Sequence, residues 1–140
     1  MNKRTGYQLV LMDSSPLYAM SDRTDPRHLS TLEILKGLSA QSLVSIFTPA
    51  MVALELHRLR LYRKPFKPHI ALKEITTILE EFPLLMPETQ DFTNALELLS
   101  RFVDQKITFA DAVTASMAFR LEARVFTFDK HFSIMGSILV

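Results

Sequence analysis

The stretch YQLVLMDSSP, residues 7–16, decides the fold class, because an apolar run stops abruptly at an aspartate and a helix-starting motif. Residues 8–12 are short and almost wholly apolar, which favours a strand buried on both faces of a parallel sheet. Ser15-Pro16 has the form of a helix N-cap followed by proline in the first turn. Asp13 is therefore predicted at the carboxyl end of a buried strand, where open α/β sheets bind ligands.

The alternation of short apolar runs and helical stretches continues along the chain. Further strands are predicted at 43–47, 83–86, 124–128 and 137–140. Helices are predicted to start near 15 and to cover about 29–38, 49–61, 69–81, 88–103 and 108–122. In the helix 88–103 we expect an inner face of Phe92, Ala95, Leu96, Leu99 and Phe102 or Val103. Helices between strands imply crossover connections, so we predict a single α/β domain, 1–140, with a mostly parallel sheet flanked by helices.

Composition excludes several classes of protein. A hydrophobic fraction of 48% with 22% charged residues indicates a globular domain rather than a disordered chain. The absence of cysteine excludes disulfides, thiolate metal sites and thiol nucleophiles, and favours a cytoplasmic location. No segment has the length of a membrane span. Only three glycines are present, in neither a GxGxxG motif nor a P-loop, which disfavours nucleotide cofactors of those kinds.

Positive charge is concentrated in one segment although the net charge is only +1. Residues 57–73 contain no acid, and the basic residues that we consider for RNA binding are Arg58, Arg60, Arg63, Lys64 and Lys67. Such a strip either neutralises an RNA backbone or forms an ordinary solvated face. Tyr62 and Phe66 lie within it, and they either stack on bases or anchor the loop on the core.

Four carboxylates stand out, and three of them have a local explanation. Asp13 can form a turn or cap a helix, Asp111 has capping-box spacing from Thr108, and Asp129 can cap the turn 130–132. Glu55 lies about two turns inside its helix, beyond the reach of capping, on or beside an apolar stripe. Its local alternative is an exposed ion pair with Arg58 at i+3.

Taken together, these acids point to a metal site. Two of them follow strands that should be neighbours in a parallel sheet, one opens a helix that leads into a strand, and one projects from a helix after another strand. Several ionised carboxylates at one sheet edge repel one another and need a cation. An all-oxygen ligand set favours Mg²⁺ or Mn²⁺, ions suited to phosphoryl chemistry.

The segments VLMDSSPLYAM, DPRH, TPAMVALEL, RFVDQKITFADAVTASMA and VFTFDKHF, in this order, resemble a PIN domain, in particular the VapC-like toxins of toxin–antitoxin pairs. The resemblance implies a five-stranded parallel sheet, a homodimer and a small antitoxin that blocks the site. It also implies that Asp13, Glu55, Asp111 and Asp129 hold Mg²⁺ or Mn²⁺ for endoribonuclease chemistry. Thr127 resembles the hydroxyl residue that the family often places near the metal, or is a β-branched strand residue. Ser14 either contacts the site or is a turn residue.

The leading hypothesis is a metal-dependent endoribonuclease, in which activated water attacks phosphorus in line and, by analogy with the family, leaves a 5′ phosphate. The alternative is a catalytically inactive PIN-fold module that binds RNA or a protein. A phosphatase of the aspartyl-phosphate kind usually needs a second acid two residues after its nucleophile, where this chain has Ser15.

Overall fold

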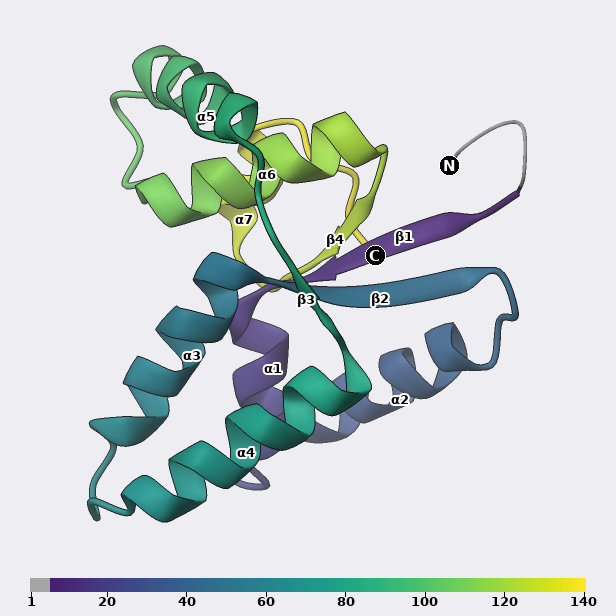
Figure 1. Cartoon of the computed structure of the whole chain (residues 1–140), viewed down its shortest axis with the longest axis vertical. Helices are drawn as coiled ribbons and strands as arrows, with labels where there is room; N and C mark the ends of the chain where they lie inside the picture. Colours follow the sequence, from purple (N-terminus) through teal and green to yellow (C-terminus); the bar gives the residue numbers. More distant parts are fainter. Residues whose placement is uncertain (1–5) are drawn as a thin grey trace.

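The computed structural model describes residues 6–140, so residues 1–5 of the predicted domain lie outside the described part. One sheet contains four parallel strands in the order β3-β2-β1-β4. The strands are β1 (Gln8–Met12), β2 (Val44–Pro49), β3 (Leu84–Leu85) and β4 (Arg124–Phe126). Helices cover both faces of this sheet, as Figure 1 shows, so the predicted α/β fold with a parallel sheet is confirmed.

The helices divide between the two faces. On one side lie α1 (Ser14–Ser21), α2 (His28–Ser39), α3 (Ala50–Leu61) and α4 (Pro68–Glu81). On the other lie α5 (Thr89–Arg101), α6 (Phe109–Leu121) and α7 (Lys130–Ile134). Each face of the sheet encloses a hydrophobic core, the first with α1–α4 and the second with α5–α7. Because side chains alternate along a strand, Val10 and Met12 of β1 pack in the first core and Leu11 packs in the second.

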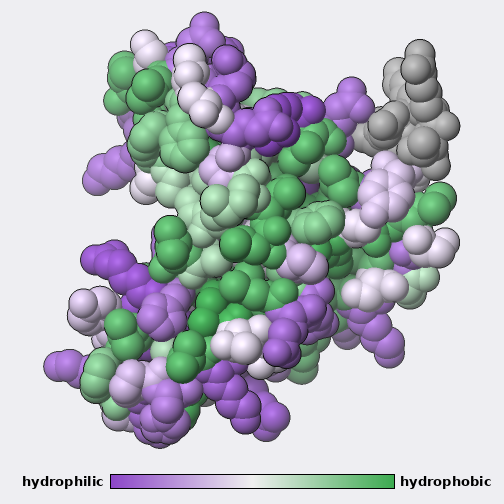
Figure 2. All heavy atoms as spheres, viewed as in Figure 1, coloured by the Kyte–Doolittle hydropathy of each residue, from purple (hydrophilic) through white to green (hydrophobic). Residues whose placement is uncertain are grey.

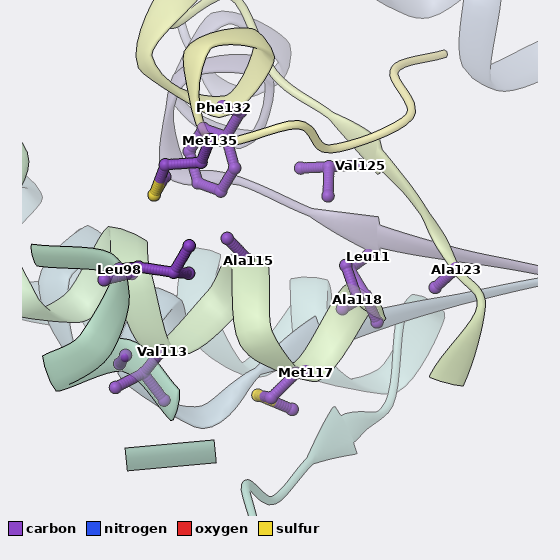
Figure 3. Packing of buried hydrophobic residues seen from close by; sticks show 12 residues of the cluster. Leu11, Leu98, Val113, Ala115, Met117, Ala118, Ala123, Val125, Phe132 and Met135 are labelled. Atoms are coloured by element: carbon purple, nitrogen blue, oxygen red, sulfur yellow. The ribbon is translucent and has the colours of Figure 1, made fainter. Parts of the chain in front are cut away.

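The second core is built on α6, whose residues 112–118 are all buried. Figure 3 shows Ala115 and Ala118 of this helix on the side of Leu11 and Val125, with Phe132 of α7 beside them. Small alanine side chains allow the helix to lie close to the sheet. The close packing fixes the first turn of α6 relative to the strand ends.

Two details differ from the sequence predictions. The segment 137–140 does not form a full fifth strand, because it pairs with the sheet only through a parallel bridge between Leu139 and Val125. The inner face predicted for the helix 88–103 is partly wrong, since Leu96 is 58% and Val103 80% exposed. The helix instead buries Asp91, together with Ala95 and Leu98.

No helix within residues 6–140 is both long enough and apolar enough to cross a membrane.

Candidate functional site: four carboxylates at the ends of the strands

Asp13 and Asp129 follow the neighbouring strands β1 and β4, and Thr127 connects them. The Thr127 hydroxyl donates a hydrogen bond to Oδ2 of Asp13 at 2.7 Å. The same oxygen of Thr127 accepts a hydrogen bond from the backbone N–H of Asp129 at 2.9 Å. One side chain therefore fixes the carboxylate of Asp13 relative to the turn that contains Asp129.

Local capping does not account for Asp13. It occupies the N-cap position of α1, but its carboxylate makes no capping hydrogen bond and is buried. Asp129 does cap α7, since its Oδ1 accepts a hydrogen bond from the backbone N–H of His131 at 2.9 Å. The backbone N–H of Asp111 donates to the Thr108 hydroxyl at 3.1 Å, and hydrogen bonds from the side chain and backbone of Thr108 lower the pKa of the Asp111 carboxyl, so this acid also takes part in the capping of its helix.

Glu55 projects from α3 into the same region. Its side chain is partly buried, and burial raises its pKa. The negative charge of Asp111 raises this pKa further, against a hydrogen bond from the Ser14 hydroxyl and the charge of Arg58. Ser14 therefore acts on the site through Glu55, a contact for which the sequence offered only a general expectation.

The pKa values of the other acids show the same crowding of negative charge. Burial raises the pKa of Asp13 to about 6, the hydrogen bonds from Thr127 and Ser14 oppose the rise, and the charges of Asp111 and Glu55 add to it. Burial also raises the pKa of Asp111, and the charge of Asp129 contributes. Among the described residues no Lys or Arg forms an ion pair with Asp13, Glu55 or Asp111, although Nδ1 of His131 lies 2.9 Å from Oδ1 of Asp129 and the charge of His131 lowers the pKa of Asp111. The negative charge of these carboxylates is therefore not fully compensated by positive side chains, and a bound cation would stabilise it.

The donor chemistry of this group fits a hard divalent cation, because all the side chains supply carboxylate oxygens. Within residues 6–140, no three or more acidic or imidazole side chains are arranged to hold a metal ion as they stand. The four carboxylates are nevertheless close enough for their charges to raise the pKa values of Asp13, Glu55 and Asp111.

Of the five basic residues considered for RNA binding, two form ion pairs with acidic side chains and three do not. Arg60 forms a bidentate ion pair with Glu74, and Arg63 pairs with Asp22 at 2.8 Å. The remaining three, Arg58, Lys64 and Lys67, are exposed and form no ion pair within the described part of the chain.

The aromatic residues of this segment were expected either to stack on bases or to anchor the loop on the core. Tyr62 is 74% and Phe66 67% exposed, so the anchoring alternative is wrong.

The sequence interpretation missed two residues beside the carboxylates. Tyr18 and Arg27 line a cavity together with Ser14, Ser15 and Leu59. The guanidinium of Arg27 lies 4.6 Å from the centre of the Phe128 ring. Arg27 belongs to the motif DPRH, which the sequence analysis singled out, but the neighbouring residues do not indicate where its side chain lies.

Comparisons with known proteins bear on the fold. A family model described as PIN domain matches residues 10–137. No curated protein matches the chain.

Solved structures with a similar fold include three that cover nearly the whole chain. VapC20 of Mycobacterium tuberculosis, a toxin that cleaves the sarcin-ricin loop, has a TM-score of 0.78 at 19% identity, over 94% of this chain and 98% of that chain. VapBC2 from Rickettsia felis, bound to a promoter DNA fragment, has a TM-score of 0.73 at 15% identity, over 94% of this chain and 96% of that chain. DNA-bound VapBC from Salmonella typhimurium has 0.71 at 14% identity, over 94% and 96%.

Proposed function

Because this chain belongs to the PIN domain family, we propose that it is a Mg²⁺- or Mn²⁺-dependent endoribonuclease and the toxin of a toxin–antitoxin pair. The observation that supports the proposal is the gathering of Asp13, Glu55, Asp111 and Asp129 from four separate segments, where each acts on the charge of others. A stable domain tolerates such a group when a cation compensates it.

The proposed chemistry assigns a task to each side chain. A divalent ion, when bound, activates water and stabilises the charge on the departing oxygen of a phosphodiester. The four carboxylates hold the ion, and Thr127 keeps the carboxylate of Asp13 in one orientation. The Ser14 hydroxyl favours the ionised form of Glu55, because it lowers the pKa of this residue. Arg27 lines the cavity beside Ser14, and its positive charge suits contact with a substrate phosphate there.

Removal of the metal tests this proposal. We expect the purified protein to cleave single-stranded RNA with Mg²⁺ or Mn²⁺, to leave 5′ phosphates, and to lose this activity completely in EDTA, since the carboxylates alone cannot stabilise the leaving oxygen. Calorimetry measures the affinity for Mn²⁺ separately from cleavage. Asp111→Asn should weaken this affinity. Asp104→Asn, which removes the same charge at an exposed position, is the control. Cleavage at an unchanged rate in EDTA would contradict the proposal. RNA binding without cleavage under all these conditions would favour the inactive binding module.

We further propose a small antitoxin protein as a partner. The support is the fold shared with VapBC proteins, two of which are seen bound to DNA. An antitoxin that blocks the carboxylates should abolish cleavage at a molar ratio near one, which a titration of activity measures.

A homodimer is also proposed, and it has a structural candidate. A groove of about 380 Å³ has wholly apolar walls, formed by Ala50, Met51, Leu54, Met86, Pro87, Phe92, Phe109, Ala110 and Val113. Figure 2 shows a hollow with hydrophobic side chains between α3 and the pair α5 and α6. Because this face has both a hollow and protruding side chains such as Leu54, a second copy related by a two-fold axis can fill it.

We expect the wild-type protein to be a dimer and Leu54→Glu to be a monomer, because the substitution places a charge in an apolar interface. Light scattering after gel filtration measures this. Leu29→Glu is the matched control, since Leu29 is as exposed as Leu54 but does not line the groove. A monomeric wild type, or dimerisation that Leu54→Glu leaves intact, would contradict the assignment.

A further inference from the structure

A cationic pocket lies at the far end of α3 from its N-terminus, where the chain turns into α4. The pocket has a volume of about 240 Å³, and its polar lining consists of Arg60, Arg63, Lys64, Lys67 and Glu74. The carboxylate of Glu74 forms an ion pair with Arg60, and Arg63 forms one with Asp22. The two lysines have no acidic partner among the described residues, so the pocket retains positive charge.

The pocket wall also contains an unused hydrogen-bond donor. Nη1 of Arg60 is buried and has no acceptor in the described part of the chain, although Nε and Nη2 both donate to Glu74. This donor has no exposed surface, so a ligand reaches it only if the pocket wall moves, whereas the exposed Lys64 and Lys67 can contact an anion directly. Geometry and charge therefore both favour an anionic ligand.

The pocket and one of the carboxylates lie on the same helix, α3. Glu55 and Arg60 are five residues apart on α3, which is about 7 Å along the helix axis. A second cavity is lined by Leu59 of the same helix together with Ser14 and Tyr18 of α1. The Tyr18 ring contacts both arginines of the pocket, with Arg60 5.3 Å and Arg63 5.7 Å from its centre. Tyr18 therefore lines the second cavity and also contacts the two arginines of the pocket.

Exposed aromatic side chains next to the pocket favour a nucleic acid over an acidic peptide. Tyr62 and Phe66 flank Lys64 in sequence and are largely exposed. Positive charge alternating with accessible aromatic rings is typical of surfaces that bind single strands, where the charge follows the backbone and the rings stack on bases.

We propose that this pocket is a second RNA-binding site, separate from the carboxylates, which binds a backbone phosphate a few nucleotides from the bond that is cut. The inference rests on the proposed ribonuclease function. Within the basic strip it assigns direct phosphate contact to Lys64 and Lys67. Arg60 serves both as part of the pocket wall and as the ion-pair partner of Glu74.

The test uses the double variant Lys64→Gln/Lys67→Gln, with Lys36→Gln/Lys73→Gln as the control. Lys36 and Lys73 are also exposed, and they lie outside the pocket. Binding of a single-stranded RNA of about 12 nucleotides is measured in EDTA, so that no cleavage interferes. The pocket variant should bind about tenfold more weakly, and its salt dependence should fall by about 1.4 in log–log slope, because two phosphate contacts are lost. The control should behave like the wild type, and in cleavage assays the pocket variant should raise KM with kcat unchanged.

Several outcomes overturn the inference. Equal weakening in both double variants would mean that general attraction, rather than the pocket, binds RNA. Displacement of the RNA by polyglutamate at equal affinity would assign the pocket to an acidic protein. If the wild type cleaves RNA and the pocket variant has an unchanged KM, the inference fails while the proposed function stands. If RNA binding depends on the lysines but no metal produces cleavage, the proposed function fails and the pocket stands.

Discussion

Asp13→Asn is expected to stabilise the metal-free protein while it abolishes metal-dependent RNA cleavage. The stabilisation should be about 3 kcal/mol at about pH 7.5, because one pKa unit corresponds to about 1.4 kcal/mol and the pKa of Asp13 is raised from 3.8 to about 6. This corresponds to an increase in Tm of roughly 10 °C. Cleavage should fall by roughly 100-fold or more, since even groups that only orient metal ligands contribute 10- to 100-fold.

The sign follows from the direction of the pKa shift. A carboxylic acid with a raised pKa in the folded chain binds its proton more tightly there than in the unfolded chain. The cost of the buried charge is therefore fully present above about pH 6, and it disappears as the pH falls towards about 4. Thermal unfolding of the wild type and of Asp13→Asn across this range should converge at the acidic end. Asparagine keeps an oxygen that can accept the Thr127 hydrogen bond.

Added Mn²⁺ should narrow the difference in Tm, because the ion compensates the charge in the wild type only. Asp104→Asn, which removes an exposed carboxylate, should change Tm little at any pH in this range. A variant Asp13→Asn that is less stable than the wild type at about pH 7.5 would mean that the buried charge is already compensated within the chain. Cleavage at the wild-type rate in this variant would remove Asp13 from the chemistry.

Asp91→Ala is expected to destabilise the fold by about 3 kcal/mol, at the lower end of the range for breaking a buried ion pair. Asp91 is completely buried and accepts hydrogen bonds from Nε and Nη2 of Arg120 at 2.9 and 2.8 Å. It also accepts one from the backbone N–H of Glu88 at 2.7 Å. Arg120 is partly exposed, so water can replace part of what it loses, which keeps the expected effect at the lower end.

Urea denaturation of Asp91→Ala and of Asp91→Asn measures this effect. The Asn variant should lose less stability, because it still accepts the hydrogen bond from Glu88. Burial alone would raise the pKa of Asp91, but the hydrogen bonds from Arg120 and Glu88 hold it below its usual range. The contribution of the pair is therefore present above about pH 4 and disappears only in stronger acid. Full stability of Asp91→Ala would contradict this account.

The fold was predictable from the sequence because local signals agreed with the tertiary arrangement. Residues 8–12 indicated a strand buried on both faces, and β1 is indeed the strand between β2 and β4. Pro49 marked the start of a helix within a residue, as Pro at the first turn predicts. Such signals depend on a few neighbouring residues, so the sequence contains them in full.

The errors concern contacts between distant segments. The inner face of α5 was assigned from apolar spacing, yet Asp91 is buried there because Arg120 is its partner, 29 residues later in the chain. Similarly, the local context of Thr127 indicated a strand residue as readily as a site residue. Its hydrogen bond to Asp13 spans 114 residues. The catalytic roles of the four carboxylates remain a prediction, which the variants above address.

The position of β4 after the other three strands in the sequence determines when the site can form during synthesis. Thr127 leaves the ribosome well after Asp13, because the two residues are 114 positions apart in the sequence. Asp13 cannot acquire its hydrogen-bonding partner until β4 pairs with β1. A nascent chain that ends before residue 124 therefore lacks the contact between Asp13 and Thr127, and any activity that depends on this contact is delayed until β4 has been made.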